Sequence, residues 1–245
     1  MQLTDNWIDL IPQMINASRR KRARISEFEP IIVQHSTSAA EYASVCIDGP
    51  WPEAEDVIAT DANASYQYAK RAIKGRWEKG EQSIATDSRF STLYAKDVLR
   101  GPFPIGESAI ASSSGNSLDY ARHVLKGRFV AGEAAIAKTE TDGASLEWAR
   151  MYYELVVKNA SDWASWTEDQ IKLCPCWMYM YAKDYLKGRL PDVLHNHMIA
   201  FGMTLKDDYF VKKYFKAKRY QKKVKYRRKK KFSTIAEEVT AALGN

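Results

Sequence analysis

The stretch "YAKDVLRGPFPIGESAIA", from Tyr94 to Ala111, decides the fold because closely similar stretches occur elsewhere in the chain. Two of them begin at Tyr68 ("YAKRAIKGRWEKGEQSIA") and Tyr120 ("YARHVLKGRFVAGEAAIA"), and a more divergent one begins at Tyr42 ("YASVCIDGPWPEAEDVIA"). The four tyrosines lie 26 residues apart. A glycine, an aromatic residue and a glutamate keep the same period: Gly49, Gly75, Gly101 and Gly127, then Trp51, Trp77, Phe103 and Phe129, then Glu55, Glu81, Glu107 and Glu133. Such a period marks a tandem repeat.

Each repeat has the pattern of a helical hairpin. Tyr68, Ala69, Ala72 and Ile73 follow the spacing of one helical stripe and predict a first helix of about 11 residues. Gly75 comes where this helix would end, and we expect it to take the left-handed conformation that glycine adopts at little cost.

A second helix of about 7 residues is predicted after the glycine. Glu81 falls in its first turn, where the helix dipole favours an acid, and Asp87 is placed to cap the next long helix. One such hairpin cannot bury both of its faces, so neighbouring hairpins must stack.

The predicted fold is all-α: an α-solenoid of 26-residue helical hairpins with an N-terminal helical cap and a basic C-terminal helical extension. Trp148 and Tyr181, each followed by Ala, mark two degenerate repeats separated by an insertion. We expect the repeats to pack on each other rather than on the extension. Phe210, Tyr214, Ala217 and Val224 nevertheless fit a helical stripe, by which at least the first half of the extension would dock on the solenoid while its Lys and Arg face outward. The expected segments are 1–36 (cap with a basic cluster), 37–143 (regular repeats), 144–205 (degenerate repeats) and 206–245 (basic extension and final helix).

Charge is distributed unevenly along the 245 residues. Two segments, 19–24 ("RRKRAR") and 212–231, hold 18 of the 37 basic residues and none of the 30 acidic ones. No run of residues has the length and hydrophobicity of a membrane span, and no apolar signal segment follows Met1. Three cysteines fit a reducing compartment, so we expect a cytosolic protein without disulfides.

The repeat phrase resembles repeats of tailed-bacteriophage proteins, especially those of T-even-like phages. The resemblance covers residues 38–138 closely and 144–195 loosely, with departures at Ala54 (elsewhere Gly) and Pro102 (elsewhere Arg). It implies a phage accessory protein in the host cytoplasm, in a class that redirects host machinery. It implies no catalytic residue.

The basic extension carries the strongest functional signal. A polyanion relieves the self-repulsion of such a run and gains from counterion release, and the interleaved aromatic residues can stack on bases. We therefore predict binding to nucleic acid, with RNA and DNA both open, or to a host nucleoprotein such as RNA polymerase or the ribosome. An acidic protein surface and a purely solvated charged helix are the alternatives. The predicted contacts are Lys212, Lys213, Lys216, Lys218, Arg219, Lys222, Lys223, Lys225, Arg227, Arg228, Lys229, Lys230 and Lys231, with Arg19, Arg20, Lys21, Arg22 and Arg24 from the first cluster.

The expected function is binding that redirects host gene expression, with a protein partner on the solenoid face as a further possibility. The alternative is a structural or assembly protein of the virion that contacts DNA or an acidic shell. No phosphate loop, nucleophile elbow or HExxH pair occurs, so we expect no enzyme and no cofactor.

Two further groups of residues were considered. The cations at the "GR" positions recur with the repeat and either form a basic ridge or cap helices and pair with glutamates; the second interpretation is favoured. They are Lys74, Arg76, Arg100, Lys126, Arg128, Lys187 and Arg189. Cys174, Cys176, His195 and His197 invite a zinc interpretation, but their spacing does not match common structural sites, and we predict no metal.

Overall fold

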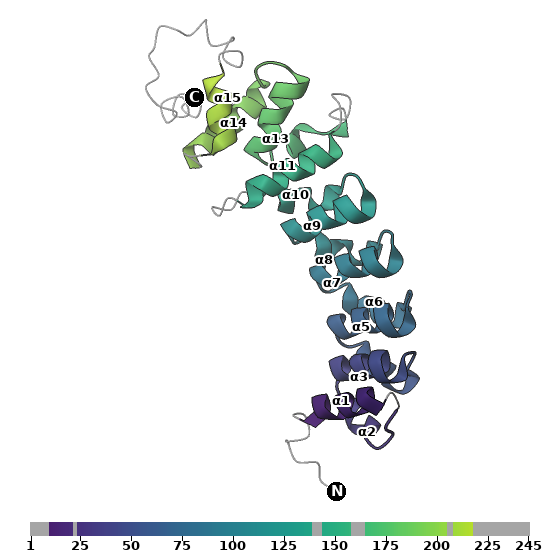
Figure 1. Cartoon of the computed structure of the whole chain (residues 1–245). Helices are drawn as coiled ribbons and strands as arrows, with labels where there is room; N and C mark the ends of the chain where they lie inside the picture. The colour runs from purple at the N-terminus through teal and green to yellow at the C-terminus, as the bar shows by residue number, and fades with distance from the viewer. Residues whose placement is uncertain (1–9, 22–23, 139–143, 158–164, 205–207, 218–245) are drawn as a thin grey trace, which may run out of the picture. The chain divides into compact units, whose positions relative to one another are not determined.

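The computed structural model describes residues 10–21, 24–138, 144–157, 165–204 and 208–217. These residues form helices joined by short turns, with no strand among them, so the described part of the chain is all-α (Figure 1). They belong to two compact units, Met1–Gly132 and Glu133–Asn245.

The first unit contains the regular repeats, and α3, α5, α7 and α9 follow one another side by side (Figure 1). Its α-helices are α1 (Ile11–Lys21), α2 (Glu29–Ile32), α3 (Ser36–Tyr42), α4 (Glu55–Ile58), α5 (Ala62–Tyr68), α6 (Glu78–Ile84), α7 (Ser88–Leu93), α8 (Glu107–Ala111) and α9 (Ser114–Tyr120). Its π-helical segments are η2 (Ala43–Ile47), η4 (Ala69–Ile73), η5 (Tyr94–Leu99) and η7 (Ala121–Leu125). Short 3-10 turns are η3 (Pro52–Ala54), η6 (Pro104–Gly106) and η8 (Val130–Gly132).

The predicted hairpin is present in each regular repeat. In the repeat of Tyr94, α7 continues directly into η5 and forms the first arm, while η6 and α8 form the second. Asp87 caps α7 as expected, because its side chain accepts hydrogen bonds from the N–H groups of Arg89 and Phe90.

The prediction that the repeat glycine takes the left-handed conformation is wrong. The first arm ends in a π-helical turn, and the residue before the glycine makes the reversal. At Arg100 φ is 52°, and the N–H of Gly101 then donates to the carbonyl of Ala95 at 3.1 Å. The left-handed residues with a side chain are Asp48, Lys74, Arg100, Lys126 and Lys187. At Gly75, neither a left-handed φ nor close packing demands glycine, since an added Cβ would meet no atom within 4 Å.

A buried tyrosine joins each repeat to the one before it. The N–H of Trp77 donates to the Tyr94 hydroxyl at 2.9 Å, and this hydroxyl donates to Glu81 Oε1 at 3.0 Å. Tyr68 and Tyr120 make the same two bonds one repeat earlier and later. The repeat glutamates therefore accept buried hydroxyl groups, whereas we had expected the helix dipole to explain them.

The same pattern begins earlier in the chain than residue 37. Tyr42 accepts the N–H of Ile25 at 2.9 Å and donates to Glu29 at 3.2 Å. Ile25 and Glu29 precede Trp51 and Glu55 by one period of 26 residues. Residues 24–42 thus repeat the contacts of the regular units inside the segment that we expected to be a cap.

The second unit contains α10 (Glu133–Ala137), α11 (Ala144–Val156), α12 (Glu168–Ile171), α13 (Pro175–Met180), η10 (Tyr181–Tyr185), α14 (Asp192–Thr204) and α15 (Tyr209–Lys216). Its buried glutamate, Glu133, accepts the hydroxyl of Tyr152 at 2.9 Å. The sequence places Trp148 at the tyrosine position, but Tyr152 makes the repeated contact, and the tyrosine follows its glutamate by 19 residues here instead of 13.

Candidate functional site

The basic extension begins with a helix that is packed into the second unit. Asp208 caps α15, since its side chain accepts the N–H of Val211 at 2.8 Å. Phe210, Val211 and Tyr214 are buried, and α15 packs on α13 and α14. Residues 209–216 thus dock through the apolar side of their helix, as the stripe predicted for the first half of the extension, and the expectation that the repeats do not pack on the extension is wrong there.

Tyr214 anchors α15 through a variant of the repeat contact. Its hydroxyl accepts the N–H of Leu190 at 3.1 Å and lies 2.9 Å from Nδ1 of His195. His195 thus occupies the place that a glutamate takes in the regular repeats. It is 8% exposed, and burial lowers the pKa of its imidazole to about 4, so the ring is neutral at pH 7.

The outer face of α15 is basic. Lys212, Lys213 and Lys216 are exposed while Phe210 and Tyr214 are buried, as the stripe of Phe210 and Tyr214 predicted. Tyr209 is 58% exposed, and the Nζ of Lys213 lies 5.3 Å from the centre of its ring. The other predicted contacts of the extension, from Lys218 to Lys231, lie outside the described residues.

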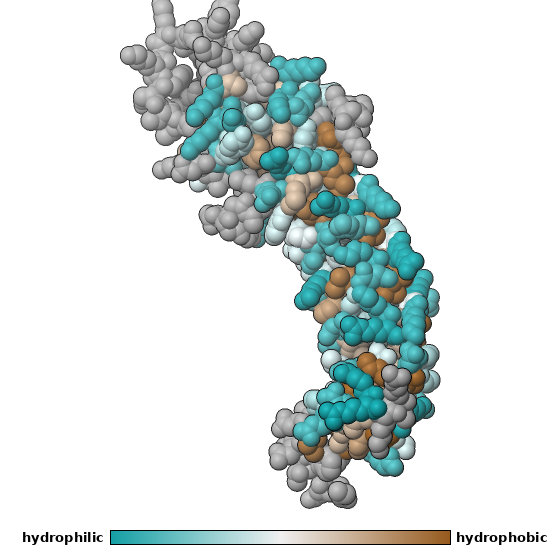
Figure 2. Space-filling model, in the orientation of Figure 1, coloured by the Kyte–Doolittle hydropathy of each residue, from teal (hydrophilic) through white to brown (hydrophobic). Residues whose placement is uncertain are grey.

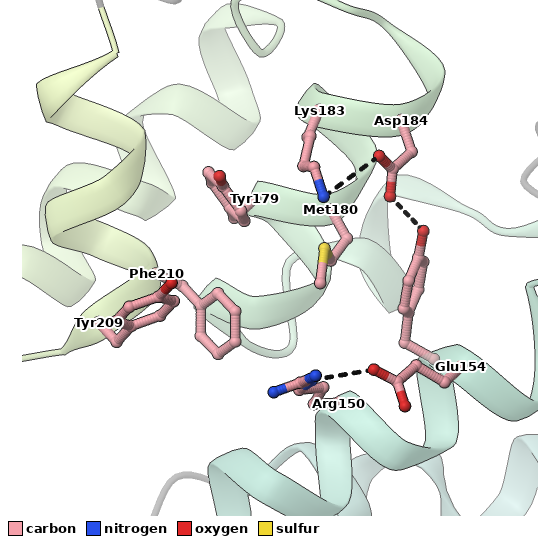
Figure 3. Close-up of a pocket in the computed structure, with 9 residues that line it drawn as sticks. Arg150, Glu154, Tyr179, Met180, Lys183, Asp184, Tyr209 and Phe210 are labelled. Carbon is pink, nitrogen blue, oxygen red and sulfur yellow. Dashed lines mark hydrogen bonds and ion pairs between the residues drawn. The ribbon is translucent and has the colours of Figure 1, made fainter.

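An open groove of about 580 Å³ adjoins the N-terminal end of α15 (Figure 3). Tyr209 and Phe210 of α15 form one side, Tyr179 and Lys183 of α13 and η10 another, and Arg150 of α11 a third. The groove thus combines aromatic rings with cations from three parts of the second unit.

Acidic side chains balance the cations in this groove. Arg150 pairs with Glu154 at 2.9 Å, and the pKa of its guanidinium is raised by this hydrogen bond. Lys183 lies 3.7 Å from Asp184, whose other oxygen accepts the Tyr153 hydroxyl. Burial and this hydrogen bond to Asp184 raise the pKa of Tyr153. Both Arg150 and Lys183 in the groove therefore have an acidic neighbour.

The first basic cluster is partly neutralised by neighbouring acids. Arg19 pairs with Glu41 at 2.6 Å. Arg24 makes two hydrogen bonds of 2.8 Å to Glu29, the acceptor of the Tyr42 hydroxyl. Arg24 therefore has a structural role that our prediction of a nucleic-acid contact missed. The sequence could have indicated this role, because Arg24 lies 52 residues, or two periods, before Arg76, which binds Glu81 in the same way.

Among the remaining members of that cluster, the structure describes the side chain of Arg20 alone. Arg20 is exposed at the end of α1, Lys21 is the last residue of that helix, and Arg22 lies outside the described residues.

The periodic cations separate into two groups. Arg76 binds Glu81 at 2.7 Å, and Arg189 binds Asp192 at 2.5 Å, as the pairing interpretation predicted. The left-handed residues Lys74, Arg100 and Lys126 are exposed to solvent, and of these three Lys74 pairs with Asp48 at 2.9 Å.

The cysteines behave as core residues. Cys174 and Cys176 are fully buried, and burial raises the pKa of the Cys174 thiol to about 12, which keeps it protonated. In the described part of the chain, no three His, Cys, Asp or Glu side chains gather as metal ligands would. His195 is instead bonded to Tyr214.

Comparison of the chain with protein-family models, curated proteins and solved structures found no match. Among the described helices, none has both the length and the apolar character that crossing a membrane requires.

Proposed function

We propose that this protein is a non-enzymatic binding protein, an α-solenoid whose basic C-terminal extension engages nucleic acid or a nucleoprotein. The observation that carries the proposal is the orientation of α15: Tyr214 fixes the helix in the second unit, and Lys212, Lys213 and Lys216 face solvent. This helix leads directly into the run from Lys218 to Lys231, which contains no acid.

The resemblance of the repeats to those of tailed bacteriophages supports a role in the cytoplasm of an infected host cell. A regulator of host transcription or translation fits an acidic helical body with an electrostatic anchor, because such an anchor binds polyanions with little sequence preference. The repeated tyrosine contacts support the solenoid architecture, since each one links a repeat to its predecessor.

The experiment is a salt titration of binding to labelled duplex and single-stranded oligonucleotides. Contacts to about six to eight phosphates give a log–log slope of roughly −5 to −7 on duplex DNA. Substituting Arg227, Arg228, Lys229, Lys230 and Lys231 together by Gln should flatten the slope by several units and leave base preference unchanged.

The matched control removes cations that face solvent elsewhere. Arg71→Gln with Arg122→Gln takes two exposed cations from the first unit and should leave the slope almost unchanged. A slope close to zero for the unaltered protein would exclude the nucleic-acid proposal.

A further inference from the structure

The turns between the two arms of each hairpin form one edge of the first unit. The ion pair of Lys74 with Asp48 at 2.9 Å joins the first two turns, and η8 of the fourth turn packs on α8, the helix that follows the third turn. We name the turn segments 48–54, 74–80, 100–106 and 126–132 the hairpin turns. In Figure 2, hydrophilic side chains cover most of the visible face of the first unit, with small hydrophobic groups exposed between them.

The first two hairpin turns are internally balanced in charge. Lys74 pairs with Asp48, Arg76 with Glu81, and Lys79 with Asp56. No large hydrophobic side chain in these two turns is exposed, because Trp51 and Trp77 are buried. In this part of the edge the cations Lys74, Arg76 and Lys79 therefore have acidic partners, and the large hydrophobic side chains are buried.

The third and fourth hairpin turns have a different character. Neither the segment "RGPFPIG" (100–106) nor "KGRFVAG" (126–132) contains an acid. Arg100 and Lys126 are exposed, and neither makes an ion pair with any residue that the structure describes. Ile105 is 54% exposed and Val130 is 57% exposed.

Both cations also hold an unfavourable backbone conformation. At Arg100 φ is 52°, and at Lys126 it is 51°, a region in which residues with a Cβ are disfavoured. Positive charge near a helix C-terminus is favourable in itself, but such a cation need not occupy the left-handed position. Asp48 and Lys74 hold the same conformation in the first two hairpin turns, so it belongs to the repeat, and what distinguishes Arg100 and Lys126 is that they are cations unpaired among the described residues.

From this combination we propose that the third and fourth hairpin turns are a docking surface for a protein partner, which contributes an acidic peptide segment with aliphatic side chains. Its carboxylates would pair with Arg100 and Lys126, and its aliphatic groups would cover Ile105 and Val130. A nucleic acid fits less well, because the aromatic rings of these turns, Phe103 and Phe129, are buried and offer no face for base stacking. The surface lies outside the basic extension and is independent of the function proposed for it.

The test measures fluorescence anisotropy of a labelled short peptide of Glu and Leu with the full chain. A Glu-only peptide of equal charge reports binding to the basic extension alone. Two double variants test the two kinds of contact. Ile105→Ser with Val130→Ser removes the exposed aliphatic side chains, and Arg100→Asn with Lys126→Asn removes the cations. Asn tolerates the left-handed conformation, and the serines replace exposed side chains, so both variants should fold, which circular dichroism checks.

Arg89→Asn is the control, because Arg89 is an exposed cation at the opposite end of the arm that ends at Arg100. We expect each double variant to lose affinity for the Glu–Leu peptide by about tenfold or more, and Arg89→Asn to keep it. Binding of the Glu-only peptide should be unchanged by the serine variant.

Three results would overturn the proposal. The first is an affinity for the Glu–Leu peptide that is absent or equal in all variants. The second is loss of oligo(dT) binding in the asparagine variant with peptide binding intact, which assigns the edge to nucleic acid. The third is self-association of the full chain that the serine variant abolishes, which assigns the surface to a second copy.

Discussion

The hydroxyl of Tyr94 donates a hydrogen bond of 3.0 Å to Glu81, which lies 13 residues earlier in the preceding hairpin. Both side chains are buried, and the N–H of Trp77 donates to the same hydroxyl. Burial, together with the hydrogen bond to Glu81, raises the pKa of Tyr94 to about 12, while the hydrogen bond from the N–H of Trp77 acts in the opposite direction. The hydroxyl is therefore protonated at pH 7 and available as a donor.

Tyr94→Phe should destabilise the protein by about 2 kcal/mol, because it leaves the buried N–H of Trp77 without a partner and removes one hydrogen bond from the buried carboxylate of Glu81, which keeps its bonds to Arg76. Urea titration followed by circular dichroism measures the change. Tyr185→Phe is the matched control, since Tyr185 is 42% exposed, and it should cost less than about 0.5 kcal/mol. Equal costs for the two variants would show that the buried contact contributes nothing.

Gly106→Ala should destabilise by about 1–3 kcal/mol, because the new Cβ would lie 2.4 Å from the Phe103 ring and 2.8 Å from Ser91 Oγ. In the first hairpin, alanines replace both equivalent residues: Ala54 for the glycine and Ala39 for the serine.

Gly106→Ala should therefore lower the free energy of unfolding by less when Ser91 is also replaced by Ala. A double-mutant cycle followed by urea titration measures this difference. Additive effects would mean that the serine does not restrict this position.

Lys126→Val should destabilise by about 1–2 kcal/mol, because a β-branched residue is strongly disfavoured at the left-handed φ of 51°. Lys126→Asn should stay within about 0.5 kcal/mol of the unaltered protein. Arg122→Val, in the π-helical segment before it, controls for the loss of an exposed cation. A valine that is equally tolerated at both positions would contradict the assigned backbone conformation.

His195 should make the second unit sensitive to acid. Because burial lowers its pKa from 6.5 to about 4, the folded state prefers the neutral ring, so its stabilising contribution is complete above pH 6.5. As the pH falls from 6.5 towards 4, stability should decrease by about 2 kcal/mol.

His195→Gln retains an acceptor for Tyr214 but does not titrate, and it should remove this part of the pH dependence in thermal unfolding between pH 7 and pH 4. A variant with the same acid sensitivity as the unaltered protein would assign the loss to other groups.

The sequence alone determined the helical class, the repeat and the residue that caps the start of α7. Helical spacing, capping residues and a strict period are local properties, so Asp87 was correctly predicted as a cap, and the buried position of Tyr94 followed from its place in the stripe. The outward direction of Lys212, Lys213 and Lys216 followed from the same periodicity.

Only the tertiary structure decided which polar groups meet. The partner of Tyr94, Glu81, lies in another hairpin. The partner of Tyr214 is His195, which is not one of the glutamates that recur with the repeat. The left-handed residue is Arg100 and not the expected Gly101, because the arm ends in a π-helical turn. The residue types of the arm do not predict such a turn. A buried polar group must find a partner wherever the packed neighbours place one, and that placement depends on contacts between hairpins rather than on spacing along the chain.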